Sequence, residues 1–126
     1  MKPEEKARVI IDRMFEEAGW KVVDRDKYVP NMTAVAIREG LMVGNREADY
    51  LLFLNGKAVG VLEAKRIETD INSDIVQEQA RLYTRSCPKW CQAWFPNIPL
   101  PLAYVANSRD LMFYDTRKSN SEFEYC

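Results

Sequence analysis

The sequence predicts an α/β domain in which helices cover a sheet whose central strands are buried on both sides. Apolar residues recur at helical spacing near the N-terminus and again in 73–85. Between these helices, the segments 48–54 and 58–65 would carry apolar residues on both of their faces as strands. This pattern is typical of strands that are covered on both sides. The chain of 126 residues suffices for one real core, so we expect residues 1–126 to form a single domain.

The first helix is predicted from Pro3 to Ala18. Proline suits the first helical position, and Glu4 and Glu5 favour the positive end of the helix dipole. Gly19 is a natural stop. One face of this helix carries Ala7, Ile10, Ile11, Met14, Phe15 and Ala18.

The segment between this helix and the central strands is the least regular part of the chain. Residues 20–23 form a short strand pattern, whereas 24–47 are charged and interrupted by proline and glycine. Within that stretch, 33–38 is the segment that can hold a strand.

The C-terminal half is predicted to contain one helix and a final pair of strands. Ser73 is a good N-cap, and the helix that it begins should end near Arg85, before a proline-broken loop at 86–101. The strand patterns follow at 102–107 and 111–115. The tail, "TRKSNSEFEYC", is polar, and we expect it to fray.

The composition excludes several kinds of active site. With no histidine, the chain cannot use Ser-His-Asp or Cys-His catalysis or a metal held by histidine. Its three cysteines are too few for a closed thiolate zinc site, and their odd number fits a reducing cytoplasm rather than a disulfide framework. No apolar run approaches a membrane span. Hydrolytic chemistry would therefore use carboxylates, lysine and a hard divalent metal.

Three charged residues stand in the two central strands, where charges are rarely buried without a partner. Because strand side chains alternate, Glu63 and Lys65 share a face. A regular ladder from a two-residue Asn55-Gly56 turn would place Asp49 on the opposite face, whereas a three-residue loop or one bulge sets it across from Glu63. We therefore predict an odd loop or a bulge, despite the strong two-residue signal. One face then carries Asp49, Leu51, Phe53, Val59, Val61, Glu63 and Lys65, and the other carries Tyr50, Leu52, Leu54, Ala58, Leu62 and Ala64.

Two converging carboxylates and a lysine indicate phosphodiester hydrolysis. Asp49 and Glu63, helped by the backbone carbonyl of Ala64, form an oxygen cage suited to Mg²⁺, with Mn²⁺ as a substitute. Lys65 is a compact charge that can orient the attacking water and stabilise the transition state. The alternative interpretation of Glu63 and Lys65 is an edge-strand ion pair that contributes about 0.2–1 kcal/mol.

These residues resemble a known family. Asp49 together with "GVLEAKR" resembles the PD-(D/E)xK nuclease superfamily. Over residues 5–115 the pattern resembles the N-terminal nuclease domain of the motor (R) subunit of type I restriction enzymes. The matching segments are "EKARVIIDRMFEEAGW", "READYLLFLNGKAVGVLEAKR", "QARLY" and "PLAYVANSRDLMFYD". The resemblance implies a restriction-endonuclease-like αβββαβ core, a mixed sheet flanked by helices.

The resemblance also implies roles for individual residues. Asp49 and Glu63 would be metal ligands and Lys65 the catalytic lysine. Gln79 and Tyr83, four positions apart on one helical face, match a Gln-xxx-Tyr motif that assists such sites or contacts the DNA backbone. Their alternative role is a surface glutamine and a core tyrosine. Glu5 stands where a first-helix acid sometimes lines the site, and its alternative role is that of an exposed acid at the helix dipole.

The function implied is that of a type I site-specific deoxyribonuclease acting on double-stranded DNA. Its partners would be modification and specificity subunits and a helicase-like motor in cis. No G-x-x-x-x-G-K-[ST] phosphate loop occurs here, so ATP would act only through a motor region beyond this chain. The net charge of −1 gives little independent affinity for DNA. The alternatives are a catalytically silent nuclease-fold module used for binding or assembly, and a stand-alone PD-(D/E)xK repair nuclease or junction resolvase.

Overall fold

The computed structural model describes residues 2–30, 32–118 and 122–126. In chain order, the elements are α1 (Pro3–Glu17), β1 (Lys21–Asp24), the 3₁₀ turn η1 (Arg25–Lys27), β2 (Ala34–Met42), β3 (Arg46–Leu54), β4 (Lys57–Ala64), α2 (Asp74–Thr84), β5 (Gln92–Ala93), β6 (Leu102–Ala106), β7 (Leu111–Asp115) and β8 (Glu124–Tyr125). No helix in these described ranges is long and apolar enough to cross a membrane.

Both helices form where the sequence predicts them. α1 has proline in its first turn, and the chain leaves it through Gly19, whose φ of +95° suits glycine. α2 is capped by Ser73, whose Oγ accepts the N–H of Val76 at 3.4 Å. A proline therefore marks the start of α1, and a serine cap marks the start of α2.

In the part of the chain that the structure describes, the strands form one eight-stranded mixed sheet, in the order β1-β2-β3-β4-β6-β7-β8, with β5 also paired to β4. β2, β3 and β4 are antiparallel neighbours, and β4 is parallel to β6. The connection from β4 to β6 runs through α2, as a parallel crossover requires. β4 therefore lies between β3 and β6 in the middle of the sheet, and the predicted mixed α/β architecture is confirmed.

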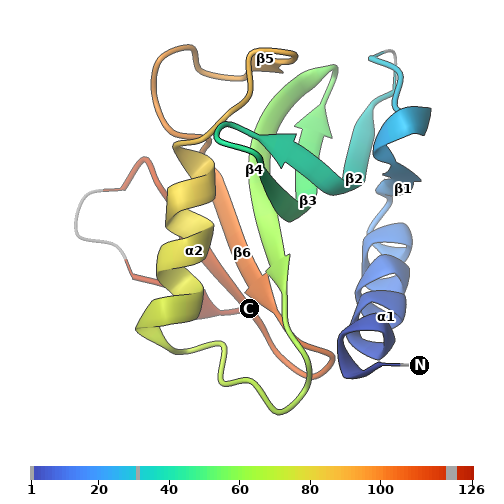
Figure 1. Ribbon diagram of the computed structural model, residues 1–126, viewed down its shortest axis with the longest axis vertical. Helices are drawn as coiled ribbons and strands as arrows, with labels where there is room; N and C mark the ends of the chain where they lie inside the picture. The colour runs from blue at the N-terminus through green and yellow to red at the C-terminus, as the bar shows by residue number, and fades with distance from the viewer. Residues whose placement is uncertain (1, 31, 119–121) are drawn as a thin grey trace.

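The two helices cover opposite faces of the sheet (Figure 1). Ile11 of α1 packs in one cluster with Tyr50 and Leu52. Val76 of α2 packs in another cluster with Val105. Strands β3, β4 and β6 are thus covered on both sides, which explains their continuous apolar sequences.

The C-terminal tail differs from the prediction. Glu124 and Tyr125 pair with β7 as strand β8, and Phe123 is buried. The ring of Phe123 stacks on that of Tyr114, with 5.2 Å between centroids. The expectation of a frayed tail is therefore wrong for 123–126, because β7 offers an open edge and Phe123 an apolar anchor.

Candidate active site

The turn between β3 and β4 has two residues. Asn55 and Gly56 both have positive φ, 51° and 81°, as a type I′ turn requires. Leu54 pairs with Lys57 across them. If the ladder continued regularly from this turn, Asp49 would face away from the carboxylate of β4.

A bulge in β4 changes that register. Phe53 pairs with Ala58, but Leu52 pairs with Gly60, so Val59 is an extra residue. The predicted bulge is therefore confirmed. Ala58 packs on the face of Phe53, and Val59 on that of Leu52. The faces predicted for Ala58 and Val59 are therefore wrong, because the extra residue lies inside the strand and not in the turn.

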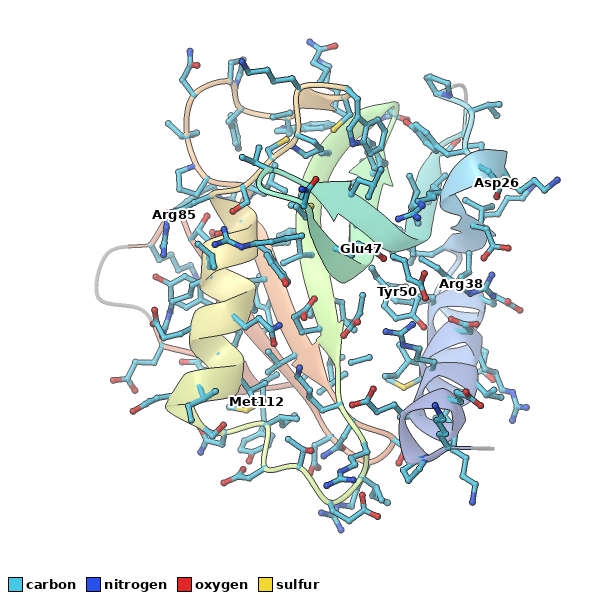
Figure 2. The ribbon with its side chains drawn as sticks, viewed as in Figure 1. Asp26, Arg38, Glu47, Tyr50, Arg85 and Met112 are labelled. Atoms are coloured by element: carbon cyan, nitrogen blue, oxygen red, sulfur yellow. The ribbon has the colours of Figure 1, made fainter. Side chains whose placement is uncertain are left out.

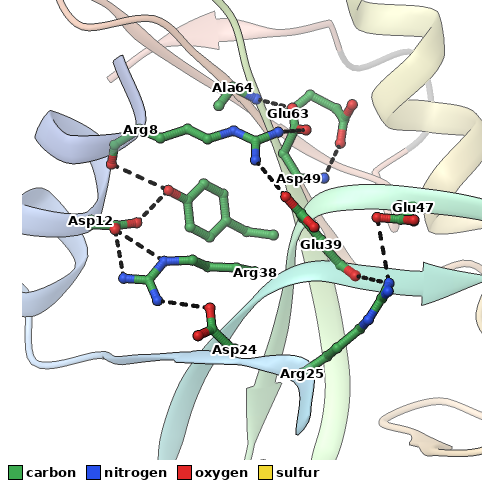
Figure 3. Close-up of polar contacts among 11 residues, drawn as sticks. Arg8, Asp12, Asp24, Arg25, Arg38, Glu39, Glu47, Asp49, Glu63 and Ala64 are labelled. Atoms are coloured by element: carbon green, nitrogen blue, oxygen red, sulfur yellow. Dashed lines mark hydrogen bonds and ion pairs between the residues drawn. The ribbon is translucent and has the colours of Figure 1, made fainter. Parts of the chain in front are cut away.

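Past the bulge, hydrogen bonds to two carboxylates take the place of the backbone–backbone hydrogen bonds between β3 and β4. The last paired residues are Tyr50 and Leu62. Beyond them, the N–H of Asp49 donates to Glu63 Oε2 at 2.9 Å, and the N–H of Ala64 donates to Asp49 Oδ2 at 2.8 Å (Figure 3). These reciprocal bonds hold the two carboxylates side by side, so the predicted convergence of Asp49 and Glu63 is confirmed.

The carboxylate pair lies in a poorly solvated place. Glu63 is only 2% exposed, and the side chain of Asp49 is 18% exposed. Burial, and then the nearby charge of Asp49, raise the pKa of Glu63 to about 8. Burial also raises the pKa of Asp49, although Arg8 and Lys65 act in the opposite direction. Ionisation of both carboxylates together is therefore disfavoured in the metal-free protein.

Lys65, which directly follows β4, is linked to α2. Its Nζ donates to Gln79 Oε1 at 2.9 Å, and Gln79 Nε2 lies 3.5 Å from the hydroxyl of Tyr83. Its backbone N–H donates to Ala106 O at 2.7 Å, which fixes the position of the residue against β6. The positive charge of Lys65 lowers the pKa of Asp49 and of Glu63, so the ammonium acts on both carboxylates. Gln79 thus contacts the lysine directly, and Tyr83 contacts Gln79.

The sequence pattern did not reveal Arg8, the cation that contacts the carboxylate pair. Arg8 Nη2 lies 2.6 Å from Asp49 Oδ1, and Arg8 Nη1 lies 3.2 Å from Glu39 Oε1. Glu39 has φ of +53°, an uncommon conformation for a residue with a side chain. The helical spacing of α1 indicated only its buried face, so neither contact had a signal in the sequence.

The acids at the start of α1 are placed differently from each other. Glu5 accepts the backbone N–H of Lys2 at 3.4 Å, as a capping residue does. Glu4 is the acid of this turn whose charge raises the pKa of Asp49. Glu4 precedes Arg8 by one helical turn, so the two share a face of α1.

The donor set fits a hard divalent cation. Both carboxylates supply oxygen ligands, and Mg²⁺ prefers such oxygens. Within 2–30, 32–118 and 122–126, no group of three or more Cys, Asp or Glu side chains is arranged to hold a metal. Further ligands would therefore be a backbone carbonyl, such as that of Ala64, water and a phosphate oxygen.

A family model described as the second domain of the type I restriction enzyme EcoKI endonuclease subunit matches residues 29–123. The chain belongs to this family. Asp49, Glu63, Lys65 and α2 all lie inside the matched region, whereas α1 precedes it. Comparison with curated proteins and with solved structures gave no match. The predicted origin in a type I restriction endonuclease subunit is thus confirmed. The family model describes a second domain, so the N-terminal position stays a prediction, as does the PD-(D/E)xK assignment.

Proposed function

We propose that this chain is a metal-dependent endodeoxyribonuclease domain of the type I restriction family, with a PD-(D/E)xK site. The observation that carries the proposal is the side-by-side placement of Asp49 and Glu63 next to Lys65. An acid pair on adjacent strands, with an amine beside it, is suited to hydrolysis of phosphodiesters in double-stranded DNA. Membership of an endonuclease subunit family supports the same chemistry.

Asp49, Glu63 and the carbonyl of Ala64 would hold Mg²⁺, or Mn²⁺ in its place. When bound, the metal would lower the pKa of a water ligand and neutralise charge that develops on the phosphate. A bound cation would also favour the ionised form of Glu63, whose pKa burial otherwise raises to about 8. Each carboxylate is oriented by a backbone N–H, so little reorganisation is needed when a metal binds.

Lys65 would orient the attacking water and stabilise the negative charge of the transition state. The amide oxygen of Gln79 accepts one of its three N–H bonds and so sets the direction of the ammonium. Tyr83 lies at the other end of the Gln79 amide and limits its rotation. Gln79 and Tyr83 would thus position Lys65 or contact the DNA backbone, and Glu5, in the first turn of α1, would be an accessory acid.

The domain would act inside a restriction complex. Its net charge of −1 supplies little attraction for DNA, so DNA would be delivered by a helicase-like motor in cis that consumes ATP. Modification and specificity subunits would choose the site. The overall activity would be that of a type I site-specific deoxyribonuclease.

The test uses the full-length subunit assembled with its partners. Asp49→Ala, Glu63→Ala and Lys65→Ala should each abolish DNA cleavage while ATP hydrolysis continues. Glu16→Ala, at an exposed position of α1, is the matched control and should cut normally. Cleavage that survives any of the three site substitutions would refute the roles assigned here.

A catalytically silent nuclease-fold module is the second candidate. The observation that favours it is the contact between Arg8 and Asp49, which already neutralises one carboxylate without a metal. Calorimetric titration with Mg²⁺ and Mn²⁺ separates the two functions. Metal uptake that is lost in Asp49→Ala supports the nuclease, whereas no uptake supports the silent module.

A further inference from the structure

We propose that Arg8 is a built-in counter-ion that competes with the divalent metal for Asp49, so that metal entry transfers Arg8 to Glu39 alone. The inference rests on the metal-dependent function proposed above. It is carried by the guanidinium of Arg8, which contacts Asp49 and Glu39 at the same time (Figure 3).

The competition follows from which carboxylate oxygens already have a partner. Asp49 Oδ2 accepts the N–H of Ala64, and Glu63 Oε2 accepts the N–H of Asp49. The oxygens without a backbone N–H partner, Asp49 Oδ1 and Glu63 Oε1, would therefore be the ones best placed to hold a metal. Arg8 Nη2 lies 2.6 Å from Asp49 Oδ1. A magnesium–oxygen bond is about 2.0–2.1 Å long, so the metal would lie against the guanidinium and be repelled by it.

Glu39 is placed to keep Arg8 after Arg8 leaves Asp49. Glu39 Oε1 is 3.2 Å from Arg8 Nη1, and the two side chains are 54% and 30% exposed. Arg8 can therefore turn toward solvent without leaving a charge buried and unpaired. The positive φ of Glu39 adds an independent indication, because such strained conformations gather at functional sites.

Arg8 also comes from a different part of the chain than the proposed catalytic groups. It lies on α1, before the region 29–123 that matches the restriction family, whereas Asp49 and Glu63 lie within it. The packing of α1 on the sheet thus brings in a cation that the matched region does not supply. While Arg8 is in place, it compensates the buried acids and holds the metal position closed.

The test measures Mn²⁺ and Mg²⁺ binding to the chain by calorimetry, and its free energy of unfolding in EDTA by urea titration. Arg8→Gln should bind Mn²⁺ about tenfold more tightly and be less stable without metal, because the acids lose their counter-ion. Glu39→Gln should bind metal more weakly, since Arg8 then has Asp49 as its remaining partner. In the double variant, the Glu39 effect should vanish, because it acts through Arg8.

Two further variants keep the test decisive. Arg38 bridges Asp12 at 2.7 Å and Asp24 at 3.1 Å, and it lies next to Tyr50 near α1 (Figure 2). Arg38→Gln should therefore lower stability without changing metal affinity. Arg8→Lys keeps the charge but loses the planar fork whose two nitrogens contact Asp49 and Glu39, so it should also bind metal more tightly than the parent. It replaces Arg8→Gln in the test if that variant does not fold.

The outcomes separate this inference from the proposed function. If the parent binds metal through Glu63 but Arg8→Gln and Arg8→Lys bind no more tightly, Arg8 is a structural ion-pair partner and the inference fails alone. It also fails alone if the Glu39 effect persists without Arg8. If neither the parent nor any variant binds metal, the metal-dependent function fails and the inference with it.

Discussion

Replacing Glu63 with glutamine should stabilise the metal-free protein above neutral pH. The side chain keeps an oxygen that can accept the N–H of Asp49, but it no longer carries a buried charge. Because the carboxylate is 2% exposed and lies beside Asp49, its pKa is raised from 4.5 to about 8. The folded chain therefore holds a proton on Glu63 at pH values where the unfolded chain has released it.

The sign of the pH dependence follows from this difference. Between pH 4.5 and about 8 the folded state binds more protons than the unfolded state, so stability falls as pH rises through this window and then levels off. Each pKa unit corresponds to about 1.4 kcal/mol, which sets an upper bound of about 5 kcal/mol for the penalty at high pH. Because Asp49 shares the repulsion and readjusts, we expect a gain of about 2–4 kcal/mol for Glu63→Gln at pH 9, and almost none at pH 4.5.

The assay is urea unfolding in EDTA at several pH values between 4.5 and 9, followed by circular dichroism. The control is Glu16→Gln, which removes an exposed carboxylate of α1 and should leave the pH profile unchanged. A parent protein whose stability rises between pH 5 and 8, or a Glu63→Gln variant that is less stable at pH 9, would refute the reasoning. The same variant should lose metal binding, so stability and proposed function should change in opposite directions.

Three further substitutions test other parts of the structure. Gln79→Ala removes the acceptor 2.9 Å from Lys65 Nζ and should reduce cleavage about 10–100-fold with little change in unfolding midpoint; unchanged cleavage would remove Gln79 from the site. Gly60→Ala would place a Cβ 2.4 Å from Leu102 O, so the free energy of unfolding should fall by more than about 2 kcal/mol, and a neutral effect would contradict the close β4–β6 contact. Ser73→Ala removes the cap of α2 and should cost about 1 kcal/mol in urea unfolding, whereas no loss would mean that the cap is dispensable.

Features of this protein that depend on local chemistry could be predicted from its amino-acid sequence. Proline, serine and glycine mark the ends of the helices, because capping involves residues only a few positions apart. The alternation along β3 and β4 required a shift in register if Asp49 was to meet Glu63, and the bulge supplies it. The sequence could not say where the extra residue lies, because Ala58 and Val59 are both small enough for either face.

The fold was needed to show which distant groups meet at the carboxylate pair. Arg8 and Asp49 are 41 positions apart, and their contact depends on how α1 packs against the sheet. Glu39 enters through a backbone conformation that its own side chain does not favour. Likewise, Phe123 is buried because the tail pairs with the open edge of β7. The residues next to Phe123 in the sequence do not indicate this pairing. Such contacts depend on how the elements pack against one another, and helical or strand periodicity does not predict them.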